Sequence, residues 1–430
     1  MSLVALSHRN FRLLWLGEMI SLAGSIMQTA AILWHVSLLV EPSNRALALG
    51  MVGLVRVGPV VAFSLISGVA ADALDRRRLM MVTQSASMTI AFVLALLTLT
   101  GLSVVWPIYA LAALASSVSS FDLPARQALT PSLVPREHLA NALSLNQITF
   151  QAAAVAGPAL GGLVIATAGV GWAYLFNAAS FLCVLIALAL MRDVPRVQAH
   201  ERANLSIAAA LEGLRFVFSA PIIRSTMLLD FIATLFASAT ALLPIYAQDI
   251  LDVGPSGYGW LYAAPAVGSF LTSALMVRTI EHIRRRGPTL LWSVGLYGLA
   301  TILFGVSRQF WVSFACLAIT GAADTVSTVL RGVIRQLETP DRLRGRMTGV
   351  NMVFFLGGPQ LGELEAGLVA HWWTAPVSVV TGGIGTIVAT CVIAARTPQL
   401  RHYRRGELEP AAAAKSGDPS RLASRSAGPS

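Results

Sequence analysis

Charged side chains are scarce in this sequence of 430 residues, and lysine is nearly absent. Only 12% of the residues are Asp, Glu, Lys or Arg, against about 25% in a typical soluble protein. Hydrophobic residues reach 55% and the mean hydropathy is +0.69. So few charges cannot cover the surface of a soluble protein of this size. The composition therefore excludes a set of soluble domains and predicts a protein that crosses a membrane many times.

Patterns for metal binding, disulfide frameworks and nucleotide hydrolysis are also missing. The three cysteines, Cys183, Cys316 and Cys391, lie in apolar runs without a second Cys or His at metal-ligand spacing. No phosphate-binding Gly-x-x-x-x-Gly-Lys-Ser/Thr pattern occurs. The first apolar run is too long for the hydrophobic part of a signal peptide, so we assign it to a membrane span. We expect no enzyme activity, no cofactor and no metal site.

Long apolar runs are what the sequence has instead. A membrane helix needs about 20 mostly apolar residues, and twelve runs qualify. Their limits are 11–40, 47–71, 79–101, 104–125, 141–167, 172–191, 222–250, 257–280, 288–307, 310–332, 347–370 and 376–395. This pattern predicts an all-α membrane protein of twelve transmembrane helices in two pseudo-symmetric six-helix bundles. We expect one half at 1–191, a cytoplasmic linker at 192–221, a second half at 222–395 and a disordered cytoplasmic tail at 396–430.

Arginine placement predicts the orientation, because cytoplasmic loops of membrane proteins carry an excess of basic residues. If both termini are cytoplasmic, the inner segments hold 28 of the 31 basic residues. The outer loops then hold only Arg45 and Arg308, and Arg56 lies within a span. The residues responsible for the net charge of +10 thus lie on the cytoplasmic side, where they face anionic lipid headgroups. We therefore expect no nucleic-acid partner.

The two halves of the chain carry matching features at nearly constant offsets. Arg126 and Arg331 are 205 positions apart, Pro59 and Pro265 are 206 apart, and Glu18 and Asp230 are 212 apart. Gly157–Gly162 also resembles Gly358–Glu363 at an offset of 201. Such repeats indicate a duplicated six-helix unit, and transporters built this way bind substrate near the midplane between the repeats.

A loop signature at the end of span two resembles that of the major facilitator superfamily. Gly68, Asp72, Arg76 and Arg77 fit the pattern, whereas Ala73 and Asp75 depart from it. The resemblance implies an inner gate loop, in which Asp72 accepts from a neighbouring helix N-terminus and the arginines pair across the gate. A plain positively charged loop is the alternative. We include Asp122 and Arg126 in this gate region, although their spacing also fits a simple i, i+4 helix pair.

A second signature, Gly157–Pro158–x–x–Gly161–Gly162 in span five, resembles the antiporter motif of the superfamily's exporters. Proline bends the helix and glycines let a neighbour approach closely. Ordinary small-residue packing is the alternative. Four further stretches resemble one exporter branch, which contains enterobactin-exporter-like and macrolide-efflux-like proteins and is also described as transmembrane secretion effectors. These stretches are Asn10–Trp15, Asp122–Gln127, Arg344–Met347 and Gly358–Glu363.

Ionisable residues inside predicted spans are functional hypotheses, because burying a charge in a bilayer costs several kcal/mol. In the family's fold, spans one, four, seven and ten line the central cavity, which implies that Glu18, Asp230 and Asp324 face it. A carboxylate there can exchange a proton near neutrality or attract a cationic substrate. We choose Asp230 first and Asp324 second for proton coupling or substrate binding, and we add Glu363. A structural helix-to-helix hydrogen bond is the alternative for each.

Arg56 needs a partner inside the membrane. Glu18 on the adjacent span lies at a compatible depth, so we predict an Arg56–Glu18 pair with a structural or gating role. Tryptophans near span ends are expected to form an interfacial aromatic belt. They are Trp34, Trp106, Trp311, Trp372 and Trp373.

These features predict a monomeric, proton-coupled exporter in the bacterial inner membrane, working by alternating access. Its expected partners are protons, membrane lipids and a small-molecule substrate. The substrate is either a lipophilic drug-like compound or a secreted metabolite such as a siderophore. Two alternatives stay open. One is an importer of the same fold, and the other is a membrane sensor or scaffold that transports nothing.

Overall fold

The computed structural model describes residues 3–192, 215–340 and 344–404, except for the side chains of 64–66, 68–73 and 344–356. Twelve long helices run through these residues, and no strand occurs among them. The first half contains α1 Arg9–Leu39, α2 Pro42–Ala73, α3 Arg76–Leu99, α4 Trp106–Leu129, α5 Leu139–Ala168 and α6 Val170–Leu190. The second half contains α8 Pro221–Phe236, α10 Gly254–Thr279, α11 Arg286–Val306, α12 Phe310–Glu338, α13 Arg344–Trp372 and α14 Ala375–Arg396.

Eleven segments in the described part of the chain are long and apolar enough to cross a membrane. The remaining long helix, α13, occupies the eleventh predicted span. Large apolar side chains such as Val277 and Trp292 are exposed on the outside of the bundle, as expected where a protein faces lipid. The predicted fold class is therefore confirmed, and this is a multi-pass membrane protein.

The seventh span differs from the others because it is not one helix. The α8 helix ends at Phe236, and the span continues through a 3₁₀ turn at Thr240–Leu242, the short α9 at Leu243–Ile245 and a π-helical turn at Tyr246–Ile250. Pro244 lies in this second part and cannot donate a helix hydrogen bond. Discontinuous helices of this kind are common around transporter binding sites.

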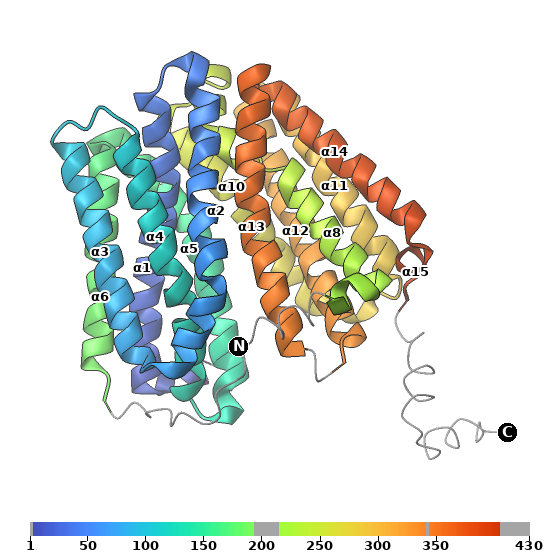
Figure 1. Cartoon of the computed structure of the whole chain (residues 1–430), viewed down its shortest axis with the longest axis horizontal. Coiled ribbons are helices and arrows are strands. Elements are labelled where there is room, and N and C mark those ends of the chain that lie inside the picture. The colour runs from blue at the N-terminus through green and yellow to red at the C-terminus, as the bar shows by residue number, and fades with distance from the viewer. Residues whose placement is uncertain (1–2, 193–214, 341–343, 405–430) are drawn as a thin grey trace.

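The two halves meet at one end of the molecule and separate towards the other (Figure 1). We call the end with Arg45, Trp34 and Tyr258 the closed end. We call the opposite end, with Arg76–Arg78 and Arg284–Arg286, the basic end. A hydrophobic cluster at the closed end combines buried residues from both halves. The clusters nearer the basic end each belong to one half. Within the described residues, the apolar packing shared by the two halves therefore lies at the closed end.

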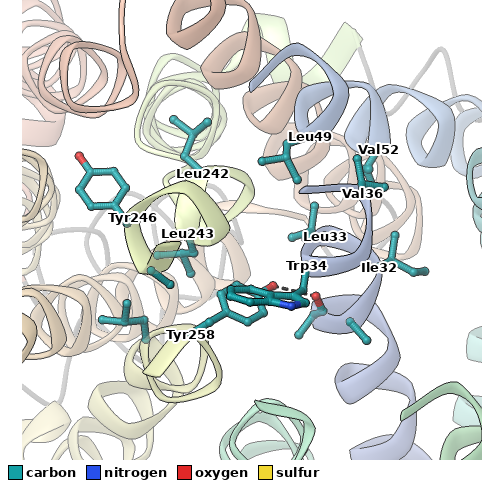
Figure 2. Packing of buried hydrophobic residues seen from close by; sticks show 14 of the residues in the cluster. Ile32, Leu33, Trp34, Val36, Leu49, Val52, Leu242, Leu243, Tyr246 and Tyr258 are labelled. Atoms are coloured by element: carbon teal, nitrogen blue, oxygen red, sulfur yellow. Dashed lines mark hydrogen bonds between the residues drawn. The ribbon is translucent and has the colours of Figure 1, made fainter. Parts of the chain in front are cut away.

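Side chains from both halves interlock within the closed end (Figure 2). The rings of Trp34 and Tyr258 lie 5.1 Å apart, and the Tyr258 hydroxyl donates to the Ala30 carbonyl at 2.8 Å. Leu242 and Leu243 of the broken seventh span pack into the same cluster. Because these contacts bury apolar area from both halves, they stabilise this conformation.

Polar contacts seal the same end. Arg45 and Asp249 form an ion pair at 2.7 Å, and Gln248 Nε2 donates to Ser37 Oγ at 2.7 Å. Each contact joins a residue of the first half to one of the second.

The tryptophans near span ends do not share one environment. Trp106, Trp311, Trp372 and Trp373 are all more than 60% exposed, as an interfacial belt requires, whereas Trp34 is 4% exposed. The belt assignment of Trp34 is therefore wrong. Its ring packs between the halves because the facing helix supplies Tyr258.

Residues 396–404 are folded, so our expectation of a disordered tail from 396 onward is wrong for this part. The short helix α15 spans Pro398–Arg401, and the Leu400 side chain is fully buried. Gly287 N–H donates to the Tyr403 carbonyl at 3.1 Å, which ties the segment to α11. The predicted tail beyond 404 and most of the predicted linker, at 193–214, lie outside the described residues.

Candidate functional site

Arg126 links two carboxylates in the first half. Its Nη2 donates to Asp122 Oδ2 at 2.7 Å, and its Nε lies 3.3 Å from Glu18 Oε1. Asp122 Oδ1 also accepts from Thr83 at 2.7 Å and Gln84 at 2.8 Å on α3. The predicted i, i+4 pair of Asp122 and Arg126 is confirmed, and the cluster ties together helices α1, α3 and α4.

Arg331 links two carboxylates in the second half in the same way. Its Nη1 lies 2.7 Å from Asp230 Oδ1, and its Nη2 lies 3.7 Å from Asp324 Oδ1. Asp230 and Arg331 are buried, whereas the Asp324 side chain is 49% exposed. This cluster joins α8 to α12 and leaves one carboxylate accessible.

The two clusters are related by the internal repeat. Glu18 and Asp230 are equivalent positions, and so are Arg126 and Arg331. The third members differ, because Asp122 lies four residues before its arginine and Asp324 lies seven before. Each cluster combines one guanidinium with two carboxylates, and in the second half Arg335 also interacts electrostatically with Asp230. One carboxylate of either cluster can accept a proton while the other keeps the arginine paired.

The predicted Arg56–Glu18 pair is wrong. The α2 helix packs mainly against α4 and α13 and makes few contacts with α1. Arg56 and Glu18 form no ion pair, and Glu18 pairs with Arg126 instead. Arg56 interacts electrostatically with Glu363 and Tyr262, both in the second half.

Glu363 lies at the contact between α2 and α13. It is 8% exposed, and its Oε2 has no hydrogen-bond partner among the described residues. Its carboxylate packs against the backbone of Gly53, one helical turn from Arg56. A buried carboxylate without a hydrogen bond is costly, so a charge placed beside Arg56 changes the free energy of the ionised Glu363.

A cavity of about 400 Å³ opens beside the first cluster. Helices α1, α2, α3, α4 and α6 form most of its wall, and Gln360 of α13 reaches it from the second half. Asp122 and Arg126 line it directly, and so does Arg56. This volume lies within the range of about 300–1,000 Å³ that is usual for small-molecule pockets.

The antiporter-type motif lies where α5 closely approaches α1 and α10. A methyl group on Gly161 would come within 2.8 Å of Met27 Cγ on α1, and one on Gly162 within 2.9 Å of Gly259 Cα on α10. Gly157 also packs against α1, and Pro158 lies within α5. The motif therefore provides the backbone contact between α5 and α10.

Arg76 and Arg77, the described basic residues of the predicted inner gate loop, do not pair across the halves in this conformation. Arg76 donates to the Ala128 carbonyl at 2.9 Å, and Arg77 donates to the Ala189 carbonyl at 3.3 Å, both within the first half. Asp75 caps α3 by accepting from the Arg78 N–H at 3.0 Å. At Gly68 and Asp72 only the backbone is described.

The sequence analysis missed the role of Arg331 as the partner of Asp230 and Asp324. A signal for it was present, because Arg331 is the repeat equivalent of Arg126. The described residues contain no group of three His, Cys, Asp or Glu side chains that could hold a metal ion.

A sequence profile of transmembrane secretion effectors matches residues 1–422. The chain belongs to this family. It is 28% identical over 411 residues to the enterobactin exporter EntS of Escherichia coli K12, covering 93% of this chain and 94% of that protein. The same values hold for the enterobactin exporter EntS of Shigella boydii serotype 18.

Solved transporter structures share the fold at low sequence identity. A bacterial homologue of the human lysosomal transporter Spinster, in an inward-facing conformation, superposes with a TM-score of 0.71 at 14% identity, covering 93% of this chain and 99% of that one. A bacterial homologue of the iron transporter ferroportin, also inward-facing, gives 0.64 at 16% identity, covering 91% and 100%. The chain is therefore a transporter of the major facilitator type and not an enzyme.

Proposed function

We propose that this protein exports a small organic molecule from the bacterial cytoplasm in exchange for protons, by alternating access. The observation that carries the proposal is the pair of clusters around Arg126 and Arg331. One cluster lies in each half, and each has one carboxylate more than its arginine can neutralise.

The proposed direction starts from the orientation. The basic end carries the arginine-rich loops, which favours the cytoplasmic side of the inner membrane, with both termini there. The closed end then faces the periplasm, and the halves are separated on the side from which an exported substrate enters. The similarity to enterobactin exporters supports the same direction.

Proton coupling follows from the charges of the clusters. Protonation of Asp324 or Glu18 removes a carboxylate from its arginine and leaves the cluster neutral. When a conformational change encloses a cluster in the dry interior, a neutral cluster costs less electrostatic free energy than a charged one. In our proposal, protons therefore load the clusters from the periplasm and leave them towards the cytoplasm.

The closed end acts as the periplasmic gate in this proposal. The backbones of the two halves touch at two pairs of glycines, because Gly162 packs against Gly259 and Gly50 packs against Gly367. The antiporter-type motif would then set how tightly the periplasmic side closes while the substrate site is open to the cytoplasm. Arg76 and Arg77 would exchange their present helix-end contacts for contacts between the halves when the basic end closes.

The substrate we propose is a siderophore-type secreted metabolite, with a lipophilic drug-like compound as the alternative. The test uses everted membrane vesicles with an acid interior, in which an exporter that exchanges substrate for protons collapses the gradient when its substrate is added. Catecholate siderophores and lipophilic cations are supplied separately. Collapse of the proton gradient by one of these two classes of compound identifies the substrate class.

Charge-neutralising variants test which carboxylates couple substrate transport to proton movement. Asp324→Asn and Glu18→Gln are expected to lower the rate of collapse at least about tenfold, the low end of what a positioned proton-transfer group contributes. The exposed Glu137→Gln is the matched control and keeps the wild-type rate. Substrate uptake driven from the periplasmic side would indicate an importer. Unchanged cellular activity of an Asp230→Asn, Asp324→Asn double variant would indicate a protein that does not depend on these carboxylates.

A further inference from the structure

We propose that Glu363 links proton binding to the closed end of the molecule. In this proposal the contact between α2 and α13 forms when the Glu363 carboxyl group is protonated and opens when it is ionised, and Arg56 is its positioning partner. The inference rests on the proton exchange proposed above and deepens it, because it assigns the residue through which a proton changes the conformation.

Each of the two arginine clusters lies within one half of the molecule. Glu18 pairs with Arg126 of its own half, and Asp230 pairs with Arg331 of its own half. Transporters with this kind of repeat change access largely by rocking one rigid half against the other. Both ion pairs therefore move with their half and keep their partners. Protonation of a cluster needs a further group if it is to act on the contact between the halves.

Glu363 lies at that contact. It belongs to α13 of the second half, and a methyl group on Gly53 of α2 would come within 2.8 Å of its Cβ and 3.1 Å of its Oε2. Arg56, the basic residue with which it interacts, lies one helical turn beyond Gly53 in the first half. Among the buried acidic residues that the structure describes, Glu363 alone interacts with a basic group of the other half.

The α2–α13 contact encloses a neutral Glu363 at lower cost than an ionised one. The residue is 8% exposed, and its Oε2 accepts no hydrogen bond from the described residues. Arg56 and Glu363 form no ion pair within 4.0 Å, so Arg56 compensates only part of the charge. A buried carboxylate without a hydrogen bond is costly. Loss of the proton therefore favours a conformation in which α2 and α13 separate and water reaches the carboxylate.

The other titratable groups that interact with Glu363 in the described part of the chain are two tyrosines of α10. Tyr258 and Tyr262 both lie close enough to influence its charge, and the Tyr258 hydroxyl already donates to the Ala30 carbonyl. Glu365 is two residues further along α13, about 200° around the helix, and so lies away from Gly53. Arg56 is therefore the charged group placed to stabilise the ionised form of Glu363.

The proton then follows the direction of the proposed exchange. When the closed end opens, the Glu363 carboxylate takes a proton from hydronium on the periplasmic side and becomes the neutral acid. The contact of α2 with α13 re-forms around this acid. Once the basic end is open, the acid gives its proton to water in the cavity that Arg56 lines. The charge left on Glu363 favours opening of the closed end again, and one proton has moved inward.

The test follows the closed end itself and needs no substrate. Spin labels are attached to Ser103→Cys in the first half and Gln309→Cys in the second, both exposed at the closed end, in the full chain without native cysteines in lipid nanodiscs. Double electron–electron resonance gives the populations of shorter and longer distances between the labels.

The longer distance should gain population as the pH rises from about 5.5 to about 8.5, the range in which shielded carboxylates exchange protons. We expect the ratio of the longer to the shorter distance to rise at least about tenfold. A tenfold difference in proton affinity between two conformations changes their ratio by this factor.

Variants locate the switch. Glu363→Gln should remove the pH response and keep the closed end shut across the range. Arg56→Gln should extend the response to higher pH, because the ionised Glu363 then has no compensating charge, and Arg56→Lys should restore the wild-type range. Glu365→Gln, the matched control, removes an acidic group from the same helix and should respond as the wild type does. An unchanged pH response in a folded Glu363→Gln protein, an equal loss in Glu365→Gln, or opening at low pH would each overturn the proposal.

The gradient-collapse assay keeps the two proposals distinguishable. A pH response that is lost in Glu363→Gln, without proton exchange for catecholate siderophores or lipophilic cations, retains the switch and rejects antiport of these compounds. Gradient collapse that is lost in Glu18→Gln but unaffected by Glu363→Gln retains antiport and rejects the switch.

Discussion

Arg331 is the residue whose loss should disturb the second half most, because it pairs with buried Asp230 and with Asp324. Arg331→Gln leaves the Asp230 carboxylate buried without its partner. Removing one member of a buried ion pair costs about 3–5 kcal/mol. We therefore expect a clear fall in the thermal unfolding temperature of the purified protein in detergent.

The double variant Arg331→Gln, Asp230→Asn tests the cause of that loss. It removes both charges and should recover part of the stability, because two neutral amides of similar size can still form a hydrogen bond. A double variant less stable than Arg331→Gln alone would contradict the ion-pair explanation. Arg308→Gln serves as the control for loss of one surface arginine.

Single residues were predicted unevenly from the sequence. The acidic residues inside the spans could be selected, because a charge in an apolar run is conspicuous. Their partners could not, because depth along a helix does not reveal which neighbour its face meets. Arg56 and Glu18 match in depth, yet α2 turns Arg56 towards α13. Trp34 shows the same limit, since only the facing Tyr258 distinguishes it from the exposed tryptophans.

Among the helices, the close contacts of α2 with α13 and of α5 with α10 determine whether the closed end can form. A methyl group on Gly50 would lie 3.0 Å from Gly367 Cα, and one on Gly162 would lie 2.9 Å from Gly259 Cα. Gly50→Ala and Gly162→Ala should therefore shift the population towards molecules open at this end. The measurement is thiol labelling of Ser37→Cys in a background without the native cysteines, which should become faster.

Gly295→Ala on α11 is the matched control, because no atom beyond its chain neighbours and its own helix backbone lies within 4 Å of the added carbon. Alanine favours a helix over glycine by about 1 kcal/mol, so this variant should fold normally and label at the wild-type rate. Equal labelling of Gly50→Ala and Gly295→Ala would contradict a role for the close contact.

The α15 segment gives a separate prediction about the second half. Leu400→Ala removes a fully buried side chain between α8, α11 and α14, and such truncations cost about 2–5 kcal/mol. The unfolding temperature should fall. Leu299→Ala, at a position that is 47% exposed on the outside of α11, should have a much smaller effect. Equal effects would show that α15 does not stabilise the bundle.

The helices themselves were largely predictable, because twelve apolar runs have no other arrangement in a bilayer. The break in the seventh span was not predicted, since its residues stay apolar and only Pro244 marks the change. The folded segment 396–404 was also missed. Its sequence is polar apart from Leu400 and Tyr403, which are buried by α11, a helix more than 90 residues earlier in the chain.

At the scale of the whole molecule, the structure is one of at least two conformations that alternating access requires. The apolar cluster that the halves share lies at the closed end, so the proposed cycle would break the contacts of Trp34, Arg45 and Ser37 with the second half each time this end opens. In that proposed cycle, the pseudo-symmetric clusters around Arg126 and Arg331 would gain and lose access together, because equivalent positions of the two halves lie at the same depth.

A bridge across the closed end tests this directly. Ser37 and Gln248 are joined by a hydrogen bond of 2.7 Å, so Ser37→Cys and Gln248→Cys, in a background without native cysteines, are suited to a short bis-methanethiosulfonate cross-linker. Cross-linked protein should lose transport, and a reductant should restore it. Substrate should still bind, because the cavity beside Arg56 is already formed in this conformation. Each single cysteine variant, treated identically, should transport normally. Continued transport by the cross-linked protein would mean that the closed end never opens, and alternating access through it would have to be abandoned.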